Sequence, residues 1–249
     1  MQPPPPQHKS KTRIFPVVLG RLAVAGLLGL AILSCLIWAG MVAVPRHLNP
    51  FAPLHIADEV NWLTRIKLSR LEGDGSQCLA VLENSDVSYK PIADRRSDDG
   101  CGLSNAVEIA GASRAVSRSF TASCPLAVAW AMFDEHVVGP AARRHLGQDV
   151  ARMIHAGTYA CRNINHRAQG RRSEHATANA IDIAGFVLAD GREVDVKRDW
   201  EGEDQRRAAF LRAVRDGACR FFDVVLSPDY NEAHHDHFHF DMGSYRACR

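Results

Sequence analysis

The segment from Leu22 to Val44 contains no charged residue, and it constrains the chain more than any other feature of the sequence. A helix rises about 1.5 Å per residue, so about 23 residues cross a hydrocarbon core of about 30 Å. The alternative is a cleaved signal peptide, but such peptides have apolar cores of only about 7–15 residues. Cys35 loosely resembles a lipoprotein cleavage site, yet the residues from Leu36 to Val44 stay apolar. We therefore predict an uncleaved transmembrane helix over residues 22–44.

Basic residues flank this segment unequally. Only Arg46 lies just beyond it, whereas four basic residues precede it: Lys9, Lys11, Arg13 and Arg21. Because positive residues stay on the cytoplasmic side, residues 1–21 are predicted to form a short cytoplasmic tail and everything after residue 44 to be exported. Residues 45–57 are rich in proline and are typical of a linker. Residues 58–249 remain as one exported domain.

The exported part contains an even number of cysteines, which in an oxidising compartment is typical of disulfides. Metal ligation is the alternative, but the sequence has no Cys-x-x-Cys pair. The simplest prediction pairs these cysteines in sequential order: Cys78 with Cys101, Cys124 with Cys161, and Cys219 with Cys248.

Hydrophobic periodicity divides the exported domain into helices and strands. We predict three helices: Asp58 to Leu71, a helix that begins near Ser123 with Pro125 in its first turn, and Asp204 to about Ala218. Strand-like runs cover residues 180–188, 221–226 and 237–242. Helices grouped early, with strands around the histidines, predict an α+β domain.

Four of the 12 histidines lie between positions 234 and 239. Side chains on a strand alternate between its two faces, so His237, His239 and Asp241 are expected on one face. Phe238 and Phe240 are then expected to point into the core. A rigid strand would thus hold two imidazoles next to each other, as a metal site requires.

A second motif lies upstream, in the sequence Ser173-Glu174-His175-Ala176-Thr177-Ala178-Asn179-Ala180-Ile181-Asp182. Small residues separate His175 from Asp182, which would let the chain fold tightly around an ion. Imidazole nitrogen and carboxylate oxygen suit Zn²⁺, and three such ligands leave a fourth position for water. A lone histidine is more often an ordinary polar residue. The combination of both motifs is much more specific and indicates a metal site.

The chain from about Asp58 to Arg249 resembles the extensin-like C-terminal domain family of bacterial proteins. Four phrases carry the resemblance: Asp94-Arg95-Arg96, Gly100-Cys101-Gly102-Leu103, Ser173-Glu174-His175-Ala176-Thr177-Ala178-Asn179-Ala180 and His235-Asp236-His237-Phe238-His239-Phe240-Asp241. That family in turn resembles the zinc D-alanyl-D-alanine carboxypeptidases and related murein endopeptidases, whose pattern is Ser-x-His-x-x-Gly-x-Ala-x-Asp followed by His-x-His. The matching residues are Ser173, His175, Ala180, Asp182, His237 and His239. Ala178 stands where the pattern has glycine, whose backbone freedom alanine lacks.

The resemblance implies the fold of these carboxypeptidases, in which a small antiparallel sheet carries a metal site and is flanked by helices. It also implies one zinc ion held by His175, Asp182 and His239. Zinc would lower the pKa of a water molecule from about 15.7 toward 7. His237 is then the candidate general base, and Arg162 would polarise the scissile carbonyl and hold the developing oxyanion.

Several residues keep two interpretations. Ser173 either makes a hydrogen bond within its loop or touches the substrate. His234 extends the second motif to His-x-x-His-x-His or caps a surface turn, and Arg162 is alternatively a surface residue beside a disulfide. Asp236 and Asp241 are candidates to orient the imidazoles, and Asp236 is also a candidate base.

Together these features predict a zinc-dependent peptidase that hydrolyses amide bonds in the stem peptides or crosslinks of peptidoglycan. The expected location is the bacterial inner membrane, crossed once, with the N-terminus in the cytoplasm and the C-terminal domain in the periplasm. The alternative is a catalytically inactive, metal-containing domain that binds the cell wall or has a structural role, and a metal carrier is a third interpretation. The net charge of +2 is too small to indicate a nucleic-acid partner.

Overall fold

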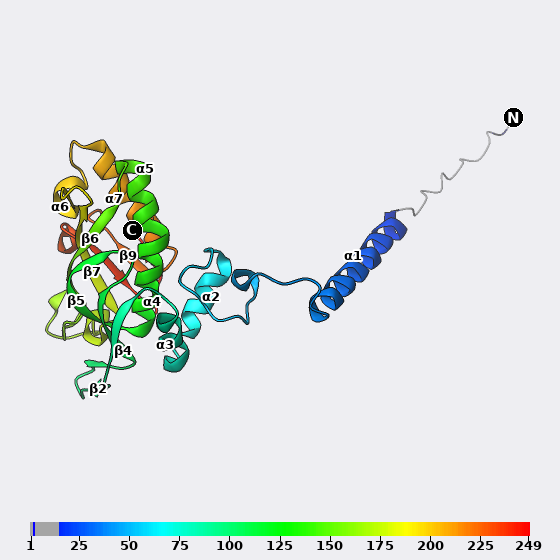
Figure 1. The fold of residues 1–249 in the computed structure, drawn as a ribbon, viewed down its shortest axis with the longest axis horizontal. Coiled ribbons are helices and arrows are strands. Elements are labelled where there is room, and N and C mark those ends of the chain that lie inside the picture. Colours follow the sequence, from blue (N-terminus) through cyan, green and yellow to red (C-terminus); the bar gives the residue numbers. More distant parts are fainter. Residues whose placement is uncertain (1, 3–14) are drawn as a thin grey trace. The chain divides into compact units, whose positions relative to one another are not determined.

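Residue 2 and residues 15–249 are described by the computed structural model of the chain (Figure 1). These residues divide into two units, residues 1–49 and residues 50–249. Lys9, Lys11 and Arg13, on which the predicted orientation in the membrane depends, lie outside the described residues.

The first unit is dominated by helix α1 (Phe15–Trp38). Its part from Leu19 to Trp38 is long and apolar enough to cross a membrane, by length and composition. The helix ends at Trp38 rather than at the predicted limit, Val44. Gly40 follows it in a left-handed conformation (φ 70°), which glycine adopts at little cost and which commonly ends a helix. A short 3-10 turn, η1 (Arg46–Leu48), comes next.

A mixed sheet organises the second unit, in the strand order β1-β4-β5-β6-β7-β10-β9-β11 with β8 paired to β7. The strands are β1 (Ser88–Ile92), β4 (Ala106–Gly111), β5 (Ala115–Ser123), β6 (Val150–Gly157), β7 (Ala180–Leu188), β8 (Glu193–Asp195), β9 (Val224–Leu226), β10 (Phe238–Asp241) and β11 (Ala247–Cys248). The pairs β5–β6 and β9–β11 are parallel, and the remaining pairs are antiparallel. The predicted α+β class is therefore confirmed, whereas the predicted small antiparallel sheet is wrong.

The sequence patterns around the histidines predict only the C-terminal half of this sheet and miss the strands from β1 to β6. In β4, Val107 and Ile109 are buried while Glu108 between them is exposed. Such alternation is the mark of a strand with one face on the core. A separate hairpin, β2 (Arg95–Arg96) with β3 (Gly102–Leu103), lies outside the main sheet.

The helices of the second unit are α2 (Trp62–Arg70), α3 (Gly75–Glu83), α4 (Cys124–Phe133), α5 (Gly139–Leu146), α6 (Val196–Asp199) and α7 (Gln205–Ala218), and the π-turn η2 (Asp134–Val138) joins α4 to α5. The predicted starts of α4 and α7 are confirmed, because the side chains of Ser123 and Asp204 accept hydrogen bonds from first-turn amides. The first predicted helix begins after Asn61 rather than at Asp58, because Asn61 and Thr64 form a capping box.

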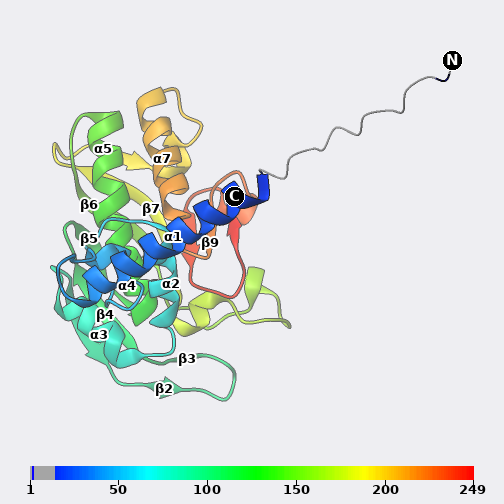
Figure 2. The ribbon, with the colours of Figure 1, turned by 90° about the vertical axis from the view of Figure 1, so that its right-hand side faces the viewer.

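Helices α4, α5 and α7 cover one face of the sheet (Figure 1), and α5 lies beside α7 (Figure 2). Phe133 of α4 meets Phe240 of β10 with ring centroids 5.3 Å apart. Phe210 of α7 meets Phe186 of β7 at 5.1 Å. Because these aromatic contacts fill the helix-covered face of β7 and β10, the opposite face of the two strands is left to polar side chains.

The second unit begins earlier than the predicted domain. Leu54 and Ile56, which fall within the predicted linker 45–57, are buried in the main hydrophobic core. The Ile56 carbonyl also lies 2.6 Å from Nε2 of His136 in η2. Residues 50–57 therefore belong to the folded unit.

Three disulfides brace this unit: Cys78–Cys124, Cys101–Cys161 and Cys219–Cys248. The sequential pairing is correct only for the last, and the first two interleave. Cys78 in α3 and Cys124 at the start of α4 are both buried where these helices pack together. Tertiary packing, rather than the distance along the chain, decides which cysteine becomes the partner.

Candidate metal centre

Two neighbouring strands hold the first pair of candidate ligands. β7 and β10 are antiparallel, and Asp182 lies directly opposite His239 in their register. Opposite residues of such a pair point to the same face, and His239 Nδ1 is 2.9 Å from Asp182 Oδ1. Phe238 and Phe240 are fully buried on the other face. The predicted alternation along this strand is therefore confirmed.

A turn before β7 brings the third candidate ligand to the same place. Residues 174–177 form a 3-10 turn, η4 (Glu174–Thr177), which the Ser173 side chain caps by accepting from the His175 amide at 3.4 Å. Ala178 then adopts a left-handed conformation (φ 54°) and directs the chain into β7. As a result, His175 Nε2 lies 3.2 Å from His239 Nδ1 and 3.2 Å from the Asp182 carboxylate.

The donor set and its spacing fit a zinc ion. Two imidazole nitrogens and one carboxylate oxygen lie within 4.8 Å of one another. Zinc ligands at about 2.0–2.2 Å from a tetrahedral centre stand about 3.4 Å apart, close to the separations found between these atoms. His175 and His239 are buried, and Asp182 is half-buried. The structure thus brings together the three residues that the motifs single out.

Both imidazoles are oriented by a second hydrogen bond. His175 Nδ1 donates to the Thr158 carbonyl at 2.9 Å, which leaves Nε2 to face the other ligands. His239 Nε2 lies 2.9 Å from Asp241 Oδ2, which leaves Nδ1 to face Asp182. Asp241 is itself held by the Gly243 amide at 2.8 Å. Partners of this kind fix the ring orientation of metal-ligating histidines.

Burial and hydrogen bonding set the protonation of this cluster. Burial alone would raise the pKa of Asp182, but hydrogen bonds from His175 and His239 outweigh it and lower that pKa. Burial alone would lower the pKa of His239, but the bonds to Asp182 and Asp241 raise it to about 9. The two carboxylates thus favour the protonated form of His239, and a cation that binds at Nδ1 must displace a proton.

A cavity of about 480 Å³ is lined by two of the three candidate ligands, Asp182 and His239. Apolar and aromatic side chains form part of its wall: Ile164, Val224, Leu226, Tyr230, Ala233 and Tyr245. Arg162 also lines it, and in the described part of the chain the guanidinium of Arg162 forms no ion pair. A cation without a carboxylate partner, in the cavity that Asp182 and His239 also line, favours negative charge there.

The candidate general base lies at the edge of this centre. His237 Nε2 is 3.7 Å from Asp182 Oδ1 and faces the cavity. His237 Nδ1 donates to Asp236 Oδ1 at 2.7 Å. This hydrogen bond to His237 is the main cause of the lowered pKa of Asp236. Asp236 therefore orients His237 and does not line the cavity, which favours the orienting role over that of a base.

His234 lines the cavity as well, and its ring centroid is 5.3 Å from that of His237. Burial, reinforced by the neighbouring His239 and His237, lowers the pKa of His234 to about 4, so the ring is neutral at neutral pH. Its Nδ1 donates to Asn231 Oδ1 at 2.7 Å. Ser173 caps η4, which confirms the predicted hydrogen bond within its loop, and Ser173 also lines the cavity.

Other residues of the site were not anticipated from the sequence. Thr158 acts through its carbonyl, which no side-chain motif marks, and the two tyrosines reach the cavity only through tertiary packing. A second close group, Asp99 with Cys101 and Cys161, also has ligand-type atoms near one another. Both of its cysteines are joined in a disulfide, so they offer no thiolate to a metal.

The family model described as extensin-like protein C-terminus matches residues 76–249. The match covers the larger part of the chain and contains all residues of the candidate centre. Comparison with curated proteins and with solved structures finds no match. The predicted family is confirmed: the chain belongs to the extensin-like protein C-terminus family.

Proposed function

We propose that this protein is a zinc-dependent peptidase that hydrolyses amide bonds in the stem peptides or crosslinks of peptidoglycan. One observation carries the proposal: His175, Asp182 and His239, from two distant motifs, converge, and Asp182 and His239 line a cavity. The resemblance of these motifs to those of the zinc D-alanyl-D-alanine carboxypeptidases gives further support.

His175, Asp182 and His239 would hold the ion. When bound, Zn²⁺ would supply Lewis-acid chemistry, lowering the pKa of water and polarising a carbonyl. His237 takes a proton at Nε2, because its Nδ1 proton is committed to Asp236. Arg162 binds the negative charge that develops on the substrate oxygen.

The same proposal includes the membrane topology. The basic residues before α1 favour a cytoplasmic N-terminus, and the disulfides favour an oxidising compartment for the second unit. In a bacterium these two constraints correspond to an inner-membrane anchor and a periplasmic domain. From there the cavity can reach the peptides of the cell wall.

Digestion of peptidoglycan tests the activity. The full chain in detergent, supplied with Zn²⁺, is incubated with purified sacculi, and the muropeptides are analysed by mass spectrometry. We expect shortened or uncrosslinked peptides, a rate about 10²–10⁴-fold lower for His237→Ala, and no products for His175→Ala. If the zinc-loaded chain binds sacculi but leaves every muropeptide unchanged, the peptidase is ruled out and the inactive wall-binding domain takes its place.

A further inference from the structure

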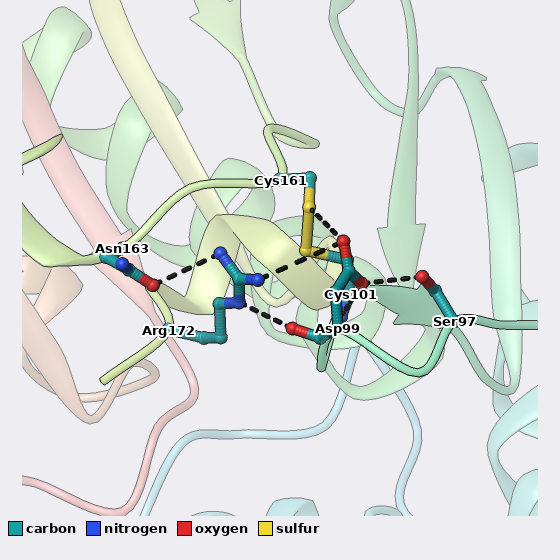
Figure 3. The surroundings of a disulfide bond; sticks show 6 residues. All are labelled: Ser97, Asp99, Cys101, Cys161, Asn163 and Arg172. Carbon is teal, nitrogen blue, oxygen red and sulfur yellow. Dashed lines mark hydrogen bonds and ion pairs between the residues drawn. A yellow bond between two sulfur atoms is a disulfide. The ribbon is translucent and has the colours of Figure 1, made fainter. Parts of the chain in front are cut away.

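Arg162 lies on a loop that is fastened to another part of the domain. Cys161, the residue before it, forms a disulfide with Cys101, which adjoins the β2–β3 hairpin (Figure 3). The Arg162 carbonyl accepts from the Ser173 amide at 3.1 Å, which closes the base of the loop formed by residues 162–173. The Ile164 amide donates to the Arg171 carbonyl at 3.0 Å and continues this pairing.

The Arg172 side chain also links this loop to the segment that contains Asp99. Its Nε donates to the Asp99 carbonyl at 2.7 Å, and one terminal nitrogen donates to Asn163 Oδ1 at 3.1 Å (Figure 3). The Asp99 carboxylate accepts from the Ser97 hydroxyl at 2.5 Å and from the Cys101 amide at 3.0 Å. A planar guanidinium thus joins the residue after Arg162 to the segment that carries Cys101.

Arg162 is therefore held from both sides, by the disulfide at position 161 and by Arg172 through position 163. The side chains of the candidate metal ligands are oriented by contacts that involve neither Arg172 nor the disulfide, although the Ala160 amide beside Cys161 donates to the His175 carbonyl at 3.0 Å. His175 is oriented by the Thr158 carbonyl, and Asp182 and His239 are fixed by the β7–β10 register. Among the described residues, no hydrogen bond joins Arg172 to the three candidate ligands.

We infer that Arg172 and the Cys101–Cys161 disulfide are positioning elements, which hold the Arg162 guanidinium at the cavity without taking part in metal binding. The inference rests on the proposed function for the role of Arg162 in the reaction. The disulfide is the covalent link of this loop among the described residues, and the Arg172 side chain adds hydrogen bonds to Asp99 and Asn163, so removing either element loosens the backbone around Arg162.

Hydrogen exchange of the full chain in detergent tests the structural half of the inference. In Arg172→Ala, and in the double variant Cys101→Ser/Cys161→Ser, we expect the Ile164 and Ser173 amides to exchange about tenfold faster or more, the scale of one lost hydrogen bond. Amides of β7 and β10 are expected to exchange as in the wild type. Arg192→Ala is the matched control, because it removes another arginine that pairs with a nearby aspartate, Asp190, at 2.7 Å. Unchanged exchange at Ile164 and Ser173 would overturn the inference, whether or not the protein is a peptidase.

Zinc titration and kinetics test the functional half. We expect zinc affinity within about twofold of wild type in Arg172→Ala, and a kcat on muropeptides that falls about tenfold. In an Arg162→Ala background, Arg172→Ala is expected to cause no further loss, because it acts through Arg162. The positioning role would be contradicted if the kcat losses of Arg162→Ala and Arg172→Ala multiplied in the double variant. A loss of zinc affinity of about tenfold in Arg172→Ala would contradict it as well. A wild-type chain without activity would refute the proposed function and leave the exchange experiment to decide the positioning.

Discussion

Ala178 has a backbone conformation that alanine resists. Its φ of 54° is one of three positive values among the non-glycine residues described. The left-handed conformation costs an L-residue about 1–2 kcal/mol. The turn nevertheless needs it, because the chain must pass from η4 into β7 while His175 stays beside Asp182. Ala178 is fully buried against Leu103 and Ala106, which favours a small side chain at this position.

Enlarging this side chain is expected to destabilise the fold. Ala178→Val adds a β-branched side chain at positive φ in a packed site and is expected to lower the free energy of unfolding by about 2–3 kcal/mol. Ala156→Val is the control, since Ala156 is exposed on β6. Denaturant unfolding of the two variants gives the comparison, and equal stabilities would show that position 178 is not constrained.

Asp241 and Asp236 each orient a histidine, and replacing them is expected to have different effects on zinc affinity and on kcat. Asp241 holds the candidate ligand His239, so Asp241→Asn is expected to lower zinc affinity about 10–100-fold. Asp236 holds His237, so Asp236→Asn is expected to lower kcat while zinc affinity stays near the wild-type value. Competition with a chromophoric chelator measures the affinities. Equal effects of both variants on zinc binding would contradict these assignments.

His155, which is not part of the candidate metal centre, is expected to make the free energy of unfolding depend on pH. Burial lowers its pKa, opposed by the hydrogen bond of Nε2 to the Arg118 carbonyl. The folded state therefore favours the neutral ring. This stability is present above the unfolded pKa of about 6.5 and is lost as pH falls through the lowered folded pKa.

His155→Phe keeps a ring against Phe120 and removes the titration, so its unfolding free energy is expected to depend less steeply on pH below about 6.5 than that of the wild type. Parallel profiles of the two proteins between neutral and acid pH would show that His155 makes no such contribution.

At this scale the sequence motifs led to His175, Asp182 and His239, because metal-ligating side chains and strand alternation leave a local signature. The hydrogen bonds that orient the His175 and His239 rings were only partly predictable from the sequence. Asp241 could be inferred from its place on the strand, whereas the Thr158 carbonyl could not, since any residue offers one.

The central structural element is the pairing of β7 with β10. Slipping this register by one residue would turn Asp182 away from His239 and expose Phe240, so the buried phenylalanines fix the site as well as the core. The limits of β7 and the starts of α4 and α7 were predictable, because capping residues and apolar runs are local signals. The strands β4 to β6 were missed because exposed residues interrupt their apolar positions, although β4 and β5 are neighbours in sequence and pair with each other.

The buried disulfide joins two elements whose packing the sequence could not reveal. Cys78 and Cys124 link α3 to α4. Cys78→Ala/Cys124→Ala is expected to lower stability by about 2–4 kcal/mol, through the loss of a cross-link in the unfolded chain. Cys35→Ala removes a free, exposed cysteine and is expected to leave the melting temperature unchanged. Equal melting temperatures for both variants would argue against a structural role for the α3–α4 bridge.

The whole molecule combines an apolar helix that fits a single-pass membrane protein with a unit braced by three disulfides, which indicates an oxidising compartment such as the periplasm. Length, composition and cysteine number predict these properties because they do not depend on tertiary contacts. The start of the folded unit does depend on them. Leu54 and Ile56 lie in a proline-containing segment, and only packing against distant residues shows that they belong to the core.

Zinc titration of the metal-free full chain tests the central claim most directly, that two separate segments hold one ion. Calorimetry with metal analysis is expected to give one Zn²⁺ per chain, with binding lost in His175→Ala and in Asp182→Ala while the circular dichroism of both variants stays that of the wild type. Absence of saturable zinc binding, or binding that survives in both variants, would contradict the account.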